Sequence, residues 1–226
     1  MQNLAAHFFN IEVFWRVRLI LLEGAVGTLK LALVSLVLAL GVGGFVFAAQ
    51  LSRWRTLRGL AEWLIDVMRA FPILVFLVLT YYLFLPLLKI RVDPFDAAAA
   101  AFALKHGVYF AEIYRSAWLA IERGQLQAAA SLGLRRWRIV QLVVIPQSAL
   151  VILPPLFNQI TFLARDMPFG FVIGYFELLT SARAAEVLVR NSTPLVIAML
   201  TYICALLLLQ AVGGRIEQFS RRRLEA

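Results

Sequence analysis

Ionisable side chains lie at helical spacing within a long apolar stretch of the chain. Lys105, Tyr109, Glu112 and Ser116 recur every three or four residues, so a helix would carry them on one face, with Arg115 on its flank. Ionisable residues are costly in an apolar helix, and they usually bind something or relay charge. A pair between Glu112 and Arg115 that only stabilises the helix is the alternative.

A second mixed pair, Arg165 and Asp166, follows another apolar stretch. Opposite charges side by side can bind a zwitterion, the cation taking its carboxylate and the anion its ammonium. An ion pair within a loop is the alternative. The sequence has no phosphate-binding loop, no paired-histidine metal motif and no Ser, His and Asp set placed for nucleophilic attack. Of its two histidines, His106 is predicted to be interfacial or packed.

The elements that must position these side chains are long apolar segments. Of the 226 residues, 62% are hydrophobic and only 15% are charged, which excludes an ordinary soluble domain with about 25% charged residues. We predict an all-α polytopic membrane protein of one domain, residues 1–226, with five transmembrane helices. The segments run from about Gly24 to Gln50, Leu60 to Leu88, Ala97 to Ile121, Gln147 to Leu163 and Thr193 to Val212.

Three parts of the chain depart from a regular transmembrane helix. Residues 1–22 mix aromatic and charged side chains, which predicts an amphipathic segment at the membrane interface. Pro154 and Pro155 remove backbone donors from the fourth transmembrane segment. Residues 169–179 are apolar but too short to span, and Gly174 interrupts them, which indicates a partly re-entrant helix on the outer side.

The net charge of +9 predicts membrane orientation rather than nucleic-acid binding. The cations form short clusters beside apolar segments, without a basic face interleaved with aromatic residues. Residues 51–60, 122–138 and 213–226 contain eleven Lys and Arg residues, against seven in the segments on the other side. The positive-inside rule then places the N-terminus outside and the tail 213–226 in the cytoplasm.

A polar, basic segment at residues 124–138 separates the third and fourth apolar stretches. Arg135, Arg136 and Arg138 would each cost roughly 2.5–3.5 kcal/mol at a bilayer centre, so the segment lies in water. Its first part predicts a short helix with a surface of small alanine side chains. Gly133, which tolerates positive φ, is predicted to end that helix.

The spacing of this segment resembles the cytoplasmic coupling loop of ABC importer permeases. That loop has Glu-Ala-Ala, three residues, Gly, nine residues, an aliphatic residue, one residue and Leu-Pro. The corresponding positions are Gln127, Ala128, Ala129, Gly133, Val143, Ile145 and Pro146, with Gln147 following as in amino-acid importers. Gln127 replaces the usual glutamate, which reduces a charged contact with the ATPase to a neutral hydrogen bond. An ordinary amphipathic loop is the alternative.

Three other stretches carry the same resemblance. The run from Gly107 to Arg115 is similar to one typical of polar amino-acid permeases. Arg165 and Asp166 resemble the family's Lys-Asp pair beside the substrate path, although Met-Pro-Phe replaces the Thr-Ser-Leu that follows. Residues 69–72 resemble the family's Arg-Gly-Thr-Pro element at two of four positions, which implies a kinked start of the helix. Lys105 stands where the family often has a neutral polar residue; it would favour a substrate carboxylate, unless it snorkels or pairs with an acid.

The resemblance implies the type I ABC importer permease fold and half of a translocation pathway for polar amino acids in a bacterial inner membrane. It implies no catalytic site, cofactor or nucleic acid on this chain, which would contact membrane lipid. The implied partners are a second permease subunit, identical or homologous, two cytoplasmic ATPases that bind ATP and Mg²⁺, and a periplasmic solute-binding protein. A membrane scaffold that recruits a soluble partner through residues 124–138 is the alternative function, and a membrane-embedded enzyme lacks a catalytic constellation.

The same resemblance assigns two sets of residues. Those for ATPase coupling are Gln127, Ala128, Ala129, Gly133, Leu134 and Pro146. Those for the substrate pathway are Lys105, Tyr109, Glu112, Arg165 and Asp166.

Overall fold

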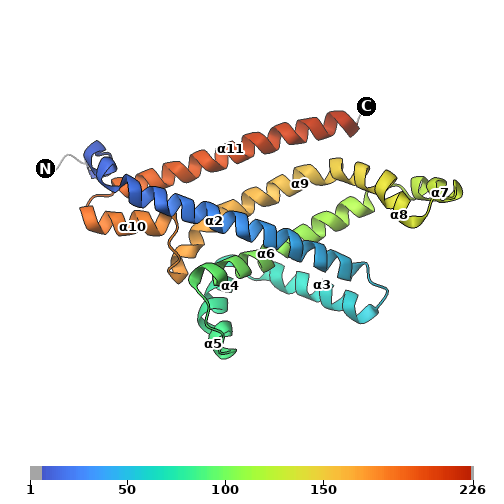
Figure 1. Cartoon of the computed structure of the whole chain (residues 1–226), viewed down its shortest axis with the longest axis horizontal. Helices are drawn as coiled ribbons and strands as arrows, with labels where there is room; N and C mark the ends of the chain where they lie inside the picture. The colour runs from blue at the N-terminus through green and yellow to red at the C-terminus, as the bar shows by residue number, and fades with distance from the viewer. Residues whose placement is uncertain (1–6, 225–226) are drawn as a thin grey trace.

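The computed structural model describes residues 7–224, in which all regular structure is helical. Four long helices run roughly along the longest axis of the molecule (Figure 1). They are α2 (Ile11–Gln50), α6 (Pro94–Leu119), α9 (Ile145–Asp166) and α11 (Thr193–Leu224). Shorter elements connect them: α3 (Arg55–Ala70), α4 (Ile73–Leu79), η1 (Thr80–Phe84), α5 (Leu85–Leu87), α7 (Arg123–Ser131), α8 (Arg136–Ile139), η2 (Val140–Val144), η3 (Met167–Ile173) and α10 (Leu178–Val189).

Helices α2 and α6 pack closely because each has a glycine at the contact. A β-carbon on Gly43 would lie 2.6 Å from Phe110 Cβ and 2.9 Å from the Gly107 carbonyl oxygen. A β-carbon on Gly107 would lie 2.5 Å from the Val42 side chain. Small residues allow such backbone contact between helices in membranes, where burial of apolar surface gives no driving force. This contact fixes α6 at the centre of the molecule.

The second predicted transmembrane segment is not a single helix. Residues 55–70 and 73–87 form two helical parts bent by 106°, and the second part projects sideways from the long helices (Figure 1). Pro72 lacks a backbone N–H, and it confines Phe71 to extended backbone with φ −73° and ψ 130°. The predicted kink is confirmed, and whether the two parts form the one span predicted from Leu60 to Leu88 stays a prediction.

The chain ends also differ from the prediction. Residues 11–22 are continuous with the rest of α2, residues 1–6 lie outside the described residues, and the interfacial position of residues 1–22 stays a prediction. With 40 residues, α2 is about 60 Å long, twice the hydrocarbon thickness of a bilayer. At the other end, α11 continues as a helix through residues 213–224 of the predicted tail.

The fourth predicted segment stays helical despite its prolines. Pro154 cannot donate to the carbonyl of Leu150, four residues earlier, and the hydroxyl of Ser220 in α11 donates to that carbonyl instead. After α9, residues 167–173 form a 3₁₀ helix that Gly174 ends with φ +78°. The predicted re-entrant segment 169–179 is therefore this 3₁₀ helix, a turn and the start of α10.

Three helical stretches within residues 7–224 are long and apolar enough to cross a membrane: Ile11–Gln50, Trp137–Ile173 and Thr193–Arg223. The bent pair Arg55–Ala70 and Ile73–Leu87 adds a fourth if it is one span. Helix α6 has 26 residues but carries Lys105, His106 and Glu112 among small alanines, which lowers its hydropathy. The count of five transmembrane helices stays a prediction.

Candidate functional site

A cavity of about 550 Å³, lined by both charged and apolar side chains, lies beside the break between α3 and α4. Helices α6 and α9 form its other walls. Ligand pockets usually have about 300–1,000 Å³, so the cavity can hold a small molecule. The lining residues are Arg69, Ala70, Phe71, Pro72, Ile73, Lys105, His106, Tyr109, Gln159, Phe162 and Asp166.

Lys105 holds the broken end of α3. Its side chain is buried, and Nζ donates to the carbonyl oxygens of Met68, at 2.5 Å, and Phe71, at 2.6 Å. Carbonyls at the end of a helix have no intrahelical donor, and the helix dipole favours a cation there. Two of the three N–H groups of Lys105 are thus used within the protein, so the residue shapes the cavity more than it serves as a free cation.

His106, in α6, links this helix to α9 at the cavity wall. Its side chain is almost completely buried, with Nδ1 2.9 Å from Gln159 Nε2 and Nε2 3.1 Å from Asp166 Oδ2. The Nε2 atom has no hydrogen-bond partner of suitable alignment among the described residues. The Asp166 side chain remains partly exposed. The cavity therefore has a carboxylate on α9 whose nearest cation-forming group is a histidine.

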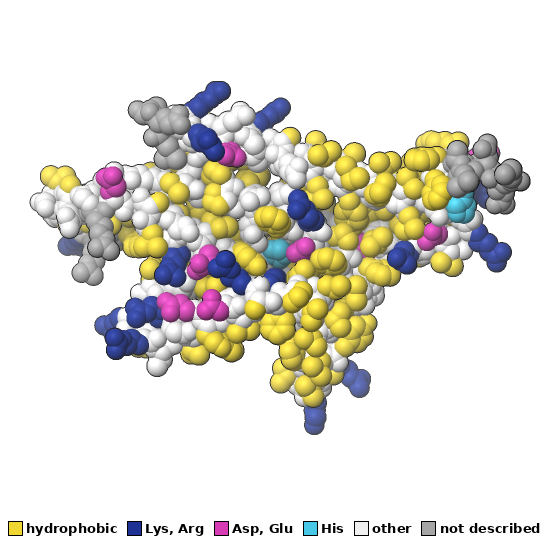
Figure 2. All heavy atoms as spheres, turned by 180° about the vertical axis from the view of Figure 1, so that it is seen from behind, with side chains coloured by type: hydrophobic (Ala, Val, Ile, Leu, Met, Phe, Trp, Pro, Cys, Tyr) yellow, Lys and Arg dark blue, Asp and Glu magenta, His cyan; other side chains and the backbone are white. Residues whose placement is uncertain are grey.

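The opposite wall carries a cation and an aromatic ring. The Arg69 guanidinium lies 5.8 Å from the centre of the Tyr109 ring, and Lys105 Nζ lies 5.5 Å from it, both within cation–π range. Arg69 is half exposed, and its NH1 lies 3.9 Å from Glu112 Oε2. Figure 2 shows charged side chains of both signs gathered across the middle of one face, over the region of α3, α6 and α9.

Two predicted pathway residues do not line the cavity. Glu112 accepts a hydrogen bond of 3.0 Å from Gln50 Nε2, and Arg69 and Arg115 each lie 3.9 Å from its oxygens. Arg165 lies over the ring of Phe162, 5.3 Å from its centre. The contact between Glu112 and Arg115 is the helix-stabilising pair that the sequence analysis gave as the alternative to a functional role.

Of the five predicted pathway residues, the cavity brings together Lys105, Tyr109 and Asp166. The pathway assignment did not include Arg69, His106 and Gln159. Arg69 and His106 are ionisable residues in apolar surroundings, which was a usable signal. Gln159 offers no comparable signal, because its role depends on contact with a residue 53 positions away.

The basic segment forms the helix that the sequence predicts. Helix α7 ends at Ser131, and Gly133 adopts φ +76°. Gly133 N donates to Ala130 O at 3.0 Å, and Leu134 N donates to Ala129 O at 3.3 Å. These two bonds make a Schellman motif, which satisfies the last carbonyls of the helix. The predicted role of Gly133 as the helix end is confirmed.

Exposure divides the predicted coupling residues into two groups. Gln127, Ala128, Gly133 and Pro146 are exposed, whereas Ala129 is buried and Leu134 is half-buried. The sequence analysis did not assign Leu132 to coupling, yet it is 81% exposed.

These parts define a class of protein, an all-helical membrane protein. It has a cavity lined by charged side chains between α3, α6 and α9 and, apart from this cavity, the exposed helix α7 in a basic segment. Residues 39–225 match the family described as "Binding-protein-dependent transport system inner membrane component". The chain belongs to this family of inner-membrane transport components. The predicted resemblance to ABC importer permeases is thereby confirmed.

Relatives and solved structures agree with this assignment. The chain is 32% identical to the glutamine transport system permease protein GlnP of Escherichia coli (strain K12) over 220 residues, covering 93% of this chain and 97% of GlnP. It is 30% identical to the arginine transport system permease protein ArtQ of Bacillus subtilis (strain 168) over 199 residues, covering 88% of this chain and 91% of ArtQ.

A crystal structure of an amino acid ABC transporter with histidines has a TM-score of 0.84 at 26% identity, covering 93% of this chain and 98% of that chain. An inward-facing structure of the MetNI methionine ABC transporter has a TM-score of 0.69 at 17% identity. The match covers 94% of this chain and 99% of that chain. The latter likeness shows the fold alone. The predicted all-α, type I ABC importer permease fold is confirmed.

Proposed function

We propose that this chain is the permease subunit of an ATP-driven importer of polar amino acids or close analogues, and that the cavity between α3, α6 and α9 is its substrate site. The observation that carries the proposal is the presence of Arg69 and Asp166 in the lining of one small cavity. The transport roles printed for GlnP and ArtQ, with glutamine and arginine, support an amino acid as substrate.

The cavity offers a partner to each charge of an amino acid. The carboxylate would bind the Arg69 guanidinium, which has only distant contacts with Glu112, and the third N–H of Lys105. The ammonium would bind the partly exposed Asp166. Charge-assisted hydrogen bonds of this kind are about twice as strong as neutral ones. The side chain would lie against Ile73 and Phe162.

The chain would work as half of a translocation pathway in a bacterial inner membrane, with its N-terminus in the periplasm and its C-terminus in the cytoplasm. It would pair with a second permease subunit and receive substrate from a periplasmic solute-binding protein. It would have no catalytic site or cofactor of its own, because two cytoplasmic ATPases would bind ATP and Mg²⁺. Those ATPases would dock on exposed Gln127, Ala128, Leu132 and Gly133. Their closure would move residues 124–138 as a lever and alternate access to the cavity.

Uptake by proteoliposomes tests the proposal. The complex that co-purifies with the tagged chain is reconstituted with internal ATP, and uptake of radiolabelled glutamine, glutamate and arginine is measured. Arg69→Gln and Asp166→Asn each remove a charge-assisted hydrogen bond worth about 1.5–3 kcal/mol, so the apparent affinity should fall roughly 10- to 100-fold. The matched control is Arg183→Gln, which removes another arginine that lies over an aromatic ring, Phe171, outside the cavity.

Two results would contradict the proposal. One is unchanged uptake by both cavity variants. The other is a complex without an ATPase and without solute-stimulated ATP hydrolysis, which would favour the scaffold function instead.

A further inference from the structure

We propose that His106 is a specificity-determining residue that competes with the substrate ammonium for Asp166, so that protonation of His106 closes the pocket to amino acids. The inference rests on the proposed function of the cavity. Its basis is the distance of 3.1 Å between His106 Nε2 and Asp166 Oδ2, in a histidine that is only 3% exposed.

Two cations, Lys105 and Arg69, line the cavity beside this pair. Helix α9 contributes Asp166 and Gln159, and α6 itself contributes Lys105 and Tyr109. Helix α3 contributes Arg69, while the start of α4 contributes only apolar Ile73. Lys105 is held by two backbone carbonyls, and Arg69 contacts Glu112. Lys105 also interacts electrostatically with Asp166, but of these groups only His106 lies within hydrogen-bonding distance of the carboxylate.

With a neutral imidazole, Asp166 keeps a full negative charge. Gln159 Nε2 donates to Nδ1, which places the single ring proton on Nε2, facing Asp166. That N–H is not aligned with the carboxylate of Asp166, so it makes no good hydrogen bond to the carboxylate oxygen. The part of Asp166 that faces the cavity is then available to an ammonium group.

With a charged imidazolium, the pocket already holds its own cation. Both ring nitrogens then carry protons, so Gln159 must turn its amide and accept from Nδ1–H through Oε1. A positive charge 3.1 Å from Oδ2 satisfies the carboxylate internally. An entering ammonium would be repelled by His106 and would gain little from Asp166.

The pH dependence of uptake follows from these two states. Acid favours the charged imidazolium, in which the carboxylate of Asp166 is already paired. Uptake should therefore fall as the pH is lowered.

Uptake of radiolabelled glutamine by the proteoliposomes is measured between pH 5 and pH 8. His106→Gln keeps an amide near Asp166 but cannot be protonated in this range, so its uptake should change less than about twofold where that of the natural chain falls about tenfold. His7→Gln, which removes the other histidine of the chain, is the matched control and should retain the full acid loss. The ratio of each variant to the natural chain cancels the pH dependence of the partners.

A second variant tests the inference independently. In the natural chain, the amide nitrogen of Gln159 lies 2.9 Å from His106 Nδ1. Gln159→Glu places a carboxylate there, which should stabilise the imidazolium. The acid loss should then begin at a higher pH. If His106→Gln keeps the natural pH profile, or if Gln159→Glu leaves the midpoint unchanged, the inference on His106 is overturned while the substrate site stands. Absence of amino-acid uptake by the natural chain at pH 7.5 overturns both.

Discussion

Glu177 is a completely buried carboxylate that hydrogen bonds satisfy. It accepts from the backbone N–H groups of Leu179 at 2.7 Å and Thr180 at 2.6 Å, which makes it the N-cap of α10. The hydroxyl of Tyr202 in α11 donates to it at 2.6 Å. Among residues 7–224 no cation pairs with it. A helix N-terminus stabilises an anion, so this one residue joins α10 to α11.

Tyr202→Phe should destabilise the protein by about 1.5–3 kcal/mol, because the hydrogen bond it removes is made to a buried charged group. Thermal unfolding in detergent, followed by tryptophan fluorescence, measures the loss. Tyr82→Phe is the control, since Tyr82 is 58% exposed and its hydroxyl makes only a long contact of 3.4 Å with Val172 O. Equal stability of the two variants would show that the bond to Glu177 contributes nothing.

Gly133→Val should uncouple ATP hydrolysis from uptake while leaving membrane insertion intact. A side chain at φ +76° costs about 1–2 kcal/mol, and more for a β-branched residue, so the turn after α7 must change shape. Gly133→Asn is the control, because asparagine tolerates this conformation. Uptake and ATPase activity are measured in the same proteoliposomes. Normal coupling in a stably inserted Val variant would remove Gly133 from the docking surface.

At the scale of elements, the contact between α2 and α6 decides where the cavity lies. Gly43→Ala would place a β-carbon 2.6 Å from Phe110 Cβ and 2.9 Å from a backbone oxygen, which cannot move aside easily. Overpacking of this kind costs about 1–3 kcal/mol. A β-carbon on the adjacent Gly44 would meet nothing within 4 Å, so Gly44→Ala should stabilise the helix by up to about 1 kcal/mol, because alanine has the higher helix propensity. Thermal unfolding in detergent compares the two variants, and a Gly43→Ala variant as stable as the Gly44→Ala variant would show that the close contact at Gly43 does not limit packing.

The sequence predicted those elements that depend on local chemistry. Gly133 ends α7, and Pro72 breaks the second apolar segment, because both effects act within a few residues. The angle of 106° was not predictable, since it depends on Lys105 binding the carbonyls at the break from another helix. The contact of His106 with Asp166 likewise joins residues 60 positions apart, and only the packing of α6 against α9 brings them together.

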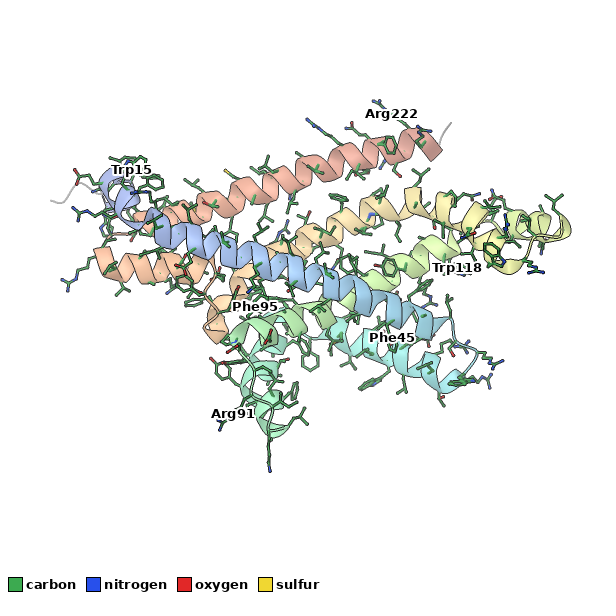
Figure 3. All side chains as sticks on the ribbon, in the orientation of Figure 1. Trp15, Phe45, Arg91, Phe95, Trp118 and Arg222 are labelled. Atoms are coloured by element: carbon green, nitrogen blue, oxygen red, sulfur yellow. The ribbon has the colours of Figure 1, made fainter. Side chains whose placement is uncertain are left out.

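At the scale of the whole molecule, the two functional regions lie apart. The cavity is near the middle of the long helices, whereas α7 and α8 lie at one end (Figure 1). Trp15 and Arg222 mark opposite ends of the molecule, and Arg91 projects from the tip of the part bent away at Pro72 (Figure 3). The turn after α2, the segment 124–138 and the end of α11 share the end opposite the first turns of α2. This grouping matches the one that charge counting proposed for the cytoplasmic side.

Cysteine labelling tests that orientation. The chain has one cysteine, Cys204, so Cys204→Ser gives a background in which a single new thiol reports its side of the membrane. Trp137→Cys, 52% exposed in α8, should react with an impermeant maleimide only in inverted vesicles. Leu188→Cys, 72% exposed in α10 at the other end, should react in intact spheroplasts. The positive-inside rule requires this result, because the arginines beside Trp137 are held on the cytoplasmic side. Reaction of the Trp137 variant from outside would reverse the orientation and remove α7 from the reach of a cytoplasmic ATPase.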